Sequence, residues 1–565
     1  MGKPFKRAKR TVKKGISGLV NLGKKIVKTA VNVVQKAVSW ITPSFPTFDA
    51  SFGDTPMDNY EQGLLLNKQS NDASIPVIYG ERMLGGTRVF LESSGSQNQS
   101  LYMALVLCEG EIQSIEEIYV DDRLVTWTGA LSHGTQVNSN DSYYRRSGVS
   151  YIQVQPFFGT DTQSSSSLLS TLSSWGSNHT LSGVCYLAFR FLWNQDVFGA
   201  IPQVKVKLKG KKIVTLNSSL VESSETYSTN PAFCILDYLR NTRYGKGLAT
   251  TDIDLQSFYD ASVVCETQVT PYSGGSDINI FDTNYALDTG RKVMENLREL
   301  VKGCRGYLPY TQGKYKLIIE TTGSASITLT EDNIIGGYVL SSPEKNSKYN
   351  RVIVSFINPD RNFQVDQAQF PPIDDSGLAS ADQHATMKTA DGGVLLEGRF
   401  EFPTLTSPYQ AEEMAEIILR RSRESLALQI TADFNAYDLA IGDILGITHT
   451  SLGFSAKNFR VLSMTFNEDY TISLNLVEHQ DSHYTFASKT QVASTPTTTL
   501  PDPFTTIDLS EALGATPLVT DEIIEYNDGV IITKMTIILS DLSLFTDSFF
   551  DYYEVEISED GGLTY

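Results

Sequence analysis

Short apolar runs separated by polar turns succeed one another along most of this chain, and they constrain its fold more than any other feature. The first runs are residues 75–80, 86–91, 101–108 and 118–125. They have the length of β-strands and are bounded by turn-forming residues such as Gly, Ser, Asn and Asp. The adjacent Asp121 and Asp122 suit the tip of a hairpin better than a carboxylate pair for catalysis. The sequence therefore predicts a mainly β protein with α+β insertions.

Helical spacing interrupts the strand pattern in the middle of the chain. It predicts helices over residues 231–239, 254–266 and 287–303, the last ending at glycines. A hairpin with its turn at Gln312 and Gly313 follows. Helices and hairpin together indicate one α+β unit.

Composition shifts along the chain predict six segments. We expect a basic amphipathic arm at 1–45; a β-rich domain at 46–215 with a Ser- and Asn-rich surface insertion at about 129–180; an α+β domain at 216–328; a β-barrel-like domain at 329–490 with one helix at 408–424; a Thr/Pro linker at 491–510; and an incomplete fibronectin-III-like sandwich at 511–565. The sandwich pattern is cut off at Tyr565, so we expect the natural polypeptide to continue.

The arm separates charge from the rest of the chain. Eleven bases and no acid precede Asp49: Lys3, Lys6, Arg7, Lys9, Arg10, Lys13, Lys14, Lys24, Lys25, Lys28 and Lys36. The remaining 35 bases face all 65 acids, a net charge of about −30 for the body. An acidic body argues against broad binding of nucleic acid around it, because it repels phosphate. We therefore expect any contact with DNA at the arm, or in a lumen through which DNA passes without being bound.

A heptad pattern also runs through the arm. It predicts a helix over about residues 15–41 with an apolar stripe on one side and a basic face of Lys24, Lys25, Lys28 and Lys36. The stripe consists of Ile16, Leu19, Val20, Gly23, Ile26, Val27, Ala30, Val33, Val34, Ala37, Trp40 and Ile41. We predict that this stripe packs against other helices, which the small residues Gly23, Ala30 and Ala37 favour. Binding to a membrane surface and a disordered or merely docked tail are the alternatives.

The sequence gives little support for catalysis, a metal or a cofactor. The histidines are scattered, and only His479 and His483 have a metal-like spacing, on a loop that we expect to be solvated. The cysteines are Cys108, Cys185, Cys234, Cys265 and Cys304, odd in number and far apart, which indicates buried thiols in a reduced interior. We therefore predict no catalytic, cofactor-binding or metal-binding residues.

Several stretches follow one another in a distinctive order. They are residues 75–90 (IPVIYGERMLGGTRVF), 105–122 (LVLCEGEIQSIEEIYVDD), 230–239 (NPAFCILDYL), 243–247 (RYGKG), 291–313, 349–360 (YNRVIVSFINPD), 410–415 (QAEEMA) and 442–445 (GDIL). In this order they resemble the central tail hub proteins of long-tailed bacteriophages, the family of the lambda tip attachment protein J. The resemblance covers about residues 70–485.

This resemblance implies a structural virion protein made of tail-tube-like β-barrel hub domains. Such a hub is a homotrimer that closes the tail tube, binds the distal tail and tail tube proteins, anchors the tape measure protein and opens for phage DNA during ejection. It also implies localisation in the virion at the tail tip, after synthesis in the host cytoplasm. Contact with a host receptor or outer membrane is expected from regions beyond this chain, and contact with lipid from the arm.

Two other functions stay open from the residues. One is a secreted β-rich adhesin or carbohydrate-binding protein, which would need a signal peptide and an aromatic-lined cleft. The other is a membrane-perforating protein that acts through the arm.

Overall fold

The computed structural model describes residues 63–69, 73–146, 148–195, 197–342, 348–371, 383–424, 426–490, 518–525 and 531–538. The chain divides into two compact units, Met1–Thr495 and Pro496–Tyr565. In the second unit the structure describes one antiparallel hairpin, β30 (Leu518–Glu525) with β31 (Ile531–Ile538). The predicted arm, including its apolar stripe and basic face, lies outside the described residues, as does the linker.

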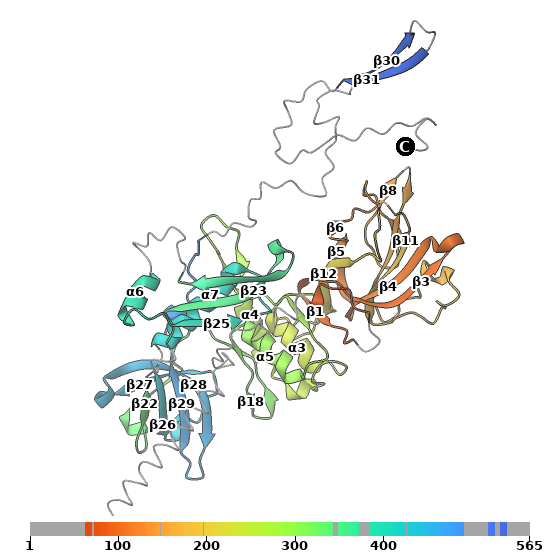
Figure 1. Cartoon of the computed structure of the whole chain (residues 1–565). Helices are drawn as coiled ribbons and strands as arrows, with labels where there is room; N and C mark the ends of the chain where they lie inside the picture. The colour runs from red at the N-terminus through yellow and green to blue at the C-terminus, as the bar shows by residue number, and fades with distance from the viewer. Residues whose placement is uncertain are drawn as a thin grey trace, which may run out of the picture. The chain divides into compact units, whose positions relative to one another are not determined.

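Two five-stranded sheets form the first domain of the larger unit and enclose one apolar core (Figure 1). The first sheet has the order β3 (Thr87–Ser94), β4 (Ser100–Glu109), β11 (Val184–Leu192), β10 (Ile152–Phe158), β7 (Val137–Asn138). The second has the order β13 (Thr226–Tyr227), β12 (Val204–Ile213), β5 (Ile112–Val120), β6 (Arg123–Leu124), with β2 (Glu81–Leu84) also on β12. Both sheets pair antiparallel. The first sheet is buried on both faces: Met103 and Leu105 of β4 belong to this core, whereas Ala104 and Val106 belong to a second core that Leu169 and Trp175 complete.

The predicted surface insertion at 129–180 is only partly a surface feature. It contains β10, whose Ile152, Val154 and Phe157 are buried between neighbouring strands. The composition of this segment does not indicate the strand, because Ser and Asn residues surround it. The strand is buried because it pairs with β11, which lies later in the chain. The hairpin tip at Asp121 and Asp122 is confirmed, since both have positive φ (49° and 64°) as a tight hairpin turn requires.

A helical domain follows, built on α3 (Pro231–Arg240), α4 (Leu255–Cys265) and α5 (Val293–Gly303). Asn230 caps α3 by accepting from the Ala232 N–H, and Asp254 caps α4 in the same way. Small hairpins accompany the helices: β14 (Gln268–Val269) with β15 (Ile278–Asn279), β17 (Gly306–Tyr307) with β20 (Ile318–Ile319), and β18 (Tyr310–Thr311) with β19 (Lys314–Tyr315). The predicted turn at Gln312 and Gly313 is confirmed by their positive φ values.

The prediction that the third helix starts at residue 287 is wrong. Tyr285–Leu287 is a strand, β16, that pairs with β1 (Val77–Tyr79). A turn closed by the Arg291 N–H on the Asp288 carbonyl separates β16 from α5. The pairing partner lies about 200 residues earlier in the chain, so helical spacing alone could not reveal it.

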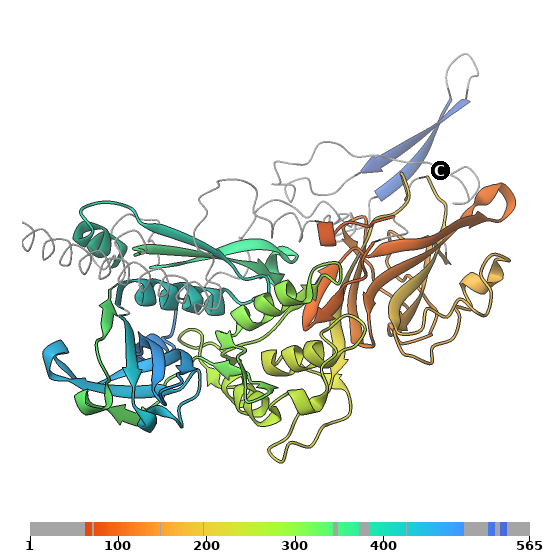
Figure 2. The ribbon, with the colours of Figure 1, turned by 90° about the horizontal axis from the view of Figure 1, so that it is seen from below.

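The helical core extends into the segment for which the sequence predicts a barrel. Helix α7 (Pro408–Glu424) packs along the sheet of β24 (Gln364–Phe370), β23 (Arg351–Asn358) and β25 (Glu397–Glu401), which Figure 2 shows from below. Apolar side chains of α7 and β23 share one core with α3, α4 and α5. A further helix, α6 (Gln383–Ala390), precedes β25. The division into domains stays a prediction.

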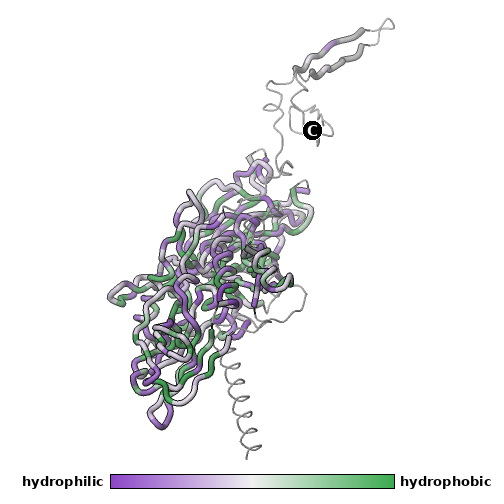
Figure 3. The backbone as a smooth tube through the Cα atoms, turned by 90° about the vertical axis from the view of Figure 1, so that its left-hand side faces the viewer, coloured by the Kyte–Doolittle hydropathy of each residue, from purple (hydrophilic) through white to green (hydrophobic). Residues whose placement is uncertain are grey.

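The last part of the larger unit is a curled six-stranded sheet. Its order is β21 (Ile327–Leu329), β27 (Ile444–His449), β28 (Phe454–Phe466), β29 (Ile472–Glu478), β26 (Ala427–Ala432), β22 (Val339–Ser341). The two edge strands, β21 and β22, are consecutive in the chain, and Ile334 between them bridges Ala432. The sheet therefore curls around its own core, as a small barrel does. Figure 3 shows hydrophilic and hydrophobic stretches intermixed along the described backbone. Strands outnumber helices among the described elements, so the mainly β fold class is confirmed.

Candidate functional site

The stretches that carry the resemblance meet around Asp237 of α3. Its Oδ2 accepts a hydrogen bond from the Tyr79 hydroxyl at 2.6 Å and from the Tyr244 hydroxyl at 3.1 Å. Its Oδ1 accepts from the Lys211 ammonium at 2.6 Å. These residues come from β1, the turn after α3, and β12, so one carboxylate joins three elements. We call this set the Asp237 junction.

Burial keeps the two tyrosine hydroxyls of the Asp237 junction protonated. Removal from water raises the pKa of Tyr79 well above its usual value, and the Asp237 carboxylate adds to the increase. Burial, followed by the same carboxylate, also raises the pKa of Tyr244. Both phenols therefore stay protonated and donate to Asp237. Beside them Arg243 contacts Glu109 at 2.6 Å, which ties the turn to β4.

Close backbone approach explains two glycines at this junction. A Cβ on Gly245 would lie 1.9 Å from the Tyr238 carbonyl oxygen, and a Cβ on Gly210 would lie 2.2 Å from the Ile78 carbonyl oxygen. Any larger residue would push the turn away from α3, or β12 away from β1. Both positions require glycine for space.

A row of ion pairs follows β12 away from the Asp237 junction. Val204, Val206 and Leu208 point into the core, so the intervening lysines point to the other face. Each lysine of the strand contacts a carboxylate: Lys205 with Asp122 at 2.5 Å, Lys207 with Glu81 at 3.3 Å, Lys209 with Glu116 at 3.7 Å, Lys211 with Asp237 at 2.6 Å and Lys212 with Glu111 at 2.5 Å. The basic side chains of this strand therefore connect it to neighbouring strands and turns and, through Lys211, to α3.

A second junction surrounds Glu320, which follows β20. Its carboxylate accepts from the Arg421 guanidinium at 2.7 Å and from the Tyr307 hydroxyl. Burial alone would raise the pKa of Glu320, but Arg421, Arg460 and the Tyr307 hydrogen bond outweigh it and lower the pKa. Glu320 is therefore ionised, and it links the β17–β20 hairpin to α7. We call this set the Glu320 junction.

The barrel joins the Glu320 junction through Arg460 of β28. Its guanidinium donates to the Gly442 carbonyl at 2.8 Å and to the Thr321 carbonyl at 3.0 Å, and it contacts His479 Nδ1 at 3.2 Å. Burial, followed by the charge of Arg460, lowers the pKa of His479. A neutral imidazole that accepts at Nδ1 and donates from Nε2 to Asp481 at 3.0 Å satisfies all these contacts.

Residues 479–490, which we call the strap, cross from the barrel to α7. Lys489 lies near the end of the strap with its side chain only 4% exposed, between Glu413 at 2.8 Å and Glu416 of α7. Its backbone N–H donates to the Pro271 carbonyl at 2.8 Å. Earlier in the strap, the Ser482 carbonyl accepts from Arg420 at 2.9 Å. The strap thus fastens the barrel to the helical domain.

The histidine pair that the sequence singled out is part of this structure and is not solvated as expected. His479 and His483 are both buried, because the strap packs onto α7 and β28. In the described ranges no group of His, Cys, Asp and Glu side chains is arranged to hold a metal ion. All five cysteines are buried and free, as predicted. Cys108 and Cys185 are direct neighbours on β4 and β11.

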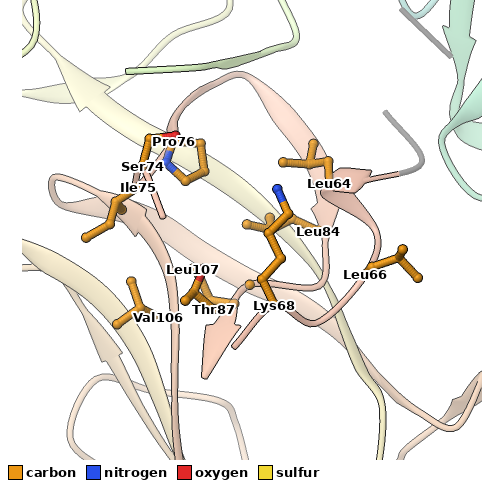
Figure 4. Close-up of a pocket in the computed structure, with 11 residues that line it drawn as sticks. Leu64, Leu66, Lys68, Ser74, Ile75, Pro76, Leu84, Thr87, Val106 and Leu107 are labelled. Carbon is orange, nitrogen blue, oxygen red and sulfur yellow. The ribbon is translucent and has the colours of Figure 1, made fainter. Parts of the chain in front are cut away.

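One small pocket opens where residues 64–68 cross β3 and β4 (Figure 4). Its walls are both apolar and polar: Leu64, Leu84 and Leu107 lie around the Lys68 side chain, and Ser74 and Thr87 complete the lining. About 30 Å³ is open to water-sized groups, room for about two water molecules. This space suits ordered water better than a substrate.

Among the described residues, no helix is both long and apolar enough to span a bilayer. The predicted contact residues of the arm are outside these ranges, so their packing is a prediction still.

Comparison with known proteins identifies similar chains among phage tail proteins. The chain is 22% identical over 467 residues to the baseplate hub protein pb3 of Escherichia phage T5, covering 72% of this chain and 47% of that protein. It is 21% identical over 305 residues to the tip attachment protein J of Escherichia phage SECphi27, covering 51% of this chain and 23% of that protein. The resemblance to phage tail hub proteins is confirmed. The chain spans about half or less of the length of these tail hub relatives.

A solved structure has a fold similar to that of this chain. A chain in the virion of a native gene transfer agent particle superposes with a TM-score of 0.50 and 13% identity, covering 84% of this chain and 99% of that one. No protein-family model matches the chain.

The stretches that carry the resemblance contain Tyr79, Asp237 and Tyr244, but the sequence alone does not place these residues together. It also predicts no role for the side chains of Lys211, Glu320, Arg421 and Lys489. No local signal marks these residues, because each forms an ion pair with a residue far away in the sequence. The charged positions within otherwise apolar stretches were the one available hint.

Proposed function

We propose that this chain is a structural virion protein, the central hub at the distal end of a phage tail tube. One observation carries the proposal: the stretches that resemble tail hub proteins are distant in sequence but share the Asp237 and Glu320 junctions. Through these junctions, buried hydrogen bonds and ion pairs connect the β-rich, helical and barrel segments. The names of the relatives, a baseplate hub protein and a tip attachment protein, agree with this role.

The hub role implies a defined set of partners. We infer that the chain forms a homotrimer, binds distal tail and tail tube proteins, anchors the tape measure protein and lets phage DNA pass during ejection. Its place is the tail tip of the virion. Host attachment involves parts beyond this chain, and the role is mechanical rather than catalytic.

The basic arm has its own part in this proposal. The apolar stripe that begins at Ile16 and ends at Ile41 packs against other arm helices, or against tape measure helices, near the threefold axis. Circular dichroism and crosslinking of a peptide of residues 1–45, alone and with the C-terminal segment of the tape measure protein, test this. A monomeric coil in both conditions, with helix only on lipid vesicles, would refute it.

The oligomeric mass tests the hub itself. Native mass spectrometry of the full chain alone should give three times the chain mass of 62.4 kDa, and the complex with the distal tail protein should contain three copies of the chain. Electron microscopy of the complex should show a threefold ring against the tube. A chain that stays monomeric in both conditions and does not bind the tube would refute the proposal.

A further inference from the structure

One end of the barrel carries an unusually exposed group of aromatic side chains. Phe434, Tyr437, Phe466 and Tyr470 are 60%, 54%, 57% and 81% exposed. The rings of Phe434 and Tyr437 stack at 4.8 Å, and those of Tyr437 and Phe466 lie 5.7 Å apart. We call these four residues the aromatic patch. The rings of Phe434, Tyr437 and Phe466 form a contiguous exposed apolar surface, with Tyr470 in the turn that follows Phe466, and such surfaces mark protein interfaces.

Acidic residues surround the aromatic patch. Asp438 and Glu468 are exposed and sit next to Tyr437 and in the turn that holds Tyr470. Neither segment 433–443 nor segment 465–473 contains a Lys or Arg. The patch therefore suits a partner that presents arginine or lysine together with an apolar side chain, since cations are attracted both to carboxylates and to aromatic faces.

The first domain presents such a group on another part of the same chain. Strands β8 (Arg145–Arg146) and β9 (Val149–Ser150) pair antiparallel and project from the domain on the side away from β1 (Figure 1). Arg145 and Arg146 are exposed, and Val149 is 48% exposed. We call this element the arginine hairpin.

The base of the arginine hairpin is held firmly. Tyr144 is buried, donates to the Val120 carbonyl at 2.8 Å and stacks on Phe198 at 5.9 Å. The Tyr151 N–H donates to the Tyr144 carbonyl at 2.8 Å. Little conformational freedom is lost when such a hairpin binds, which favours its use as a docking element.

We propose that the arginine hairpin of one copy docks on the aromatic patch of a second copy of this chain. The two surfaces are complementary in charge, and they belong to different domains. A contact between two different surfaces is head-to-tail, and it builds a closed ring when the rotation between copies closes. The inference rests on the proposed homotrimer and names the surfaces that would form it.

Charge reversal with rescue tests the contact in the full chain. The variants R145E/R146E and D438R/E468R should each weaken association by about tenfold or more, measured by sedimentation or native mass spectrometry across concentrations. The chain that carries all four substitutions should regain association, because the charges are complementary again. Since all four positions are exposed, thermal unfolding should match the parent and exclude misfolding. Unchanged association in both variants, or no recovery in the combined chain, would overturn the proposal.

Crosslinking gives an independent readout. The variant V149C/Y470C, treated with a short bismaleimide, should give covalent dimers and trimers, because the native cysteines are buried. The matched control V149C/V263C places the second thiol on α4, at a position 52% exposed, and should give only background crosslinking. A trimer without specific crosslinks overturns this contact and leaves the hub intact, whereas a chain that never associates overturns both.

Discussion

The guanidinium of Arg421 donates to the carboxylate of Glu320 at 2.7 Å, and the two side chains are only 13% and 2% exposed. This ion pair joins the β17–β20 hairpin to α7 across 101 residues of sequence. Two charges so far removed from water stabilise the fold only while both are present.

Removing one member of this pair should therefore be costly. We expect Arg421→Met to lower the free energy of unfolding by about 3–5 kcal/mol, because Glu320 is left as a buried charge without its main partner. Thermal or denaturant unfolding of the full chain measures this. Arg240→Ala, which breaks the partly exposed pair with Glu222, is the matched control and should cost about 0–1 kcal/mol. Equal losses in the two variants would contradict the assignment.

Acid should destabilise the chain through His479. Its pKa in the folded state is lowered from 6.5, first by burial and then by Arg460. The unfolded chain thus binds a proton more readily, and stability is lost as pH falls from about 6.5 toward the folded pKa. The free energy of unfolding, measured at several pH values from about 8 to about 5, should decrease as the pH falls below about 6.5. His479→Gln should reduce the slope, and an unaltered slope would exclude His479 as its source.

Close packing at the turn after α3 should make Gly245 intolerant of any side chain. Gly245→Ala puts a Cβ 1.9 Å from the Tyr238 carbonyl oxygen, so the turn must shift. We expect a loss of about 1–3 kcal/mol, with weaker protection of the Tyr79 and Tyr244 region in hydrogen exchange. Gly199→Ala meets no atom within 4 Å and should be neutral.

The five cysteines should resist thiol reagents while the chain is folded. All are buried, and burial raises the pKa of Cys185, Cys234 and Cys265 and that of Cys304 to about 12. A maleimide should label none of them within minutes in buffer and all five in denaturant. The variant Val263→Cys, on the exposed face of α4, is the positive control and should be labelled quickly. Rapid labelling of the parent chain would mean that its core opens.

Local patterns predicted much of this fold. The sequence predicts helix α7 at its observed bounds because Pro408 at its first position and its apolar spacing lie within one segment. Turn chemistry predicts the hairpin tips at Asp121–Asp122 and Gln312–Gly313. Local patterns do not reveal long-range pairing: the predicted third helix includes Leu287, the last residue of β16, and the predicted surface insertion includes β10. For the same reason the Asp237 and Glu320 junctions were invisible, because Tyr79 and Asp237 are 158 residues apart.

The three residues of β1 have a consequence for anyone who divides this chain for expression. Val77 and Tyr79 contribute to the helical core, while Ile78 between them contributes to the core of the first domain. Its partner β16 is shared in the same way. Ala286 contributes to the core of the first domain, whereas Tyr285 and Leu287 contribute to the helical core. A cut between residues 215 and 216 would give two fragments, each lacking part of its own interior. Fragments meant to fold should keep Val77 and α7 in one piece.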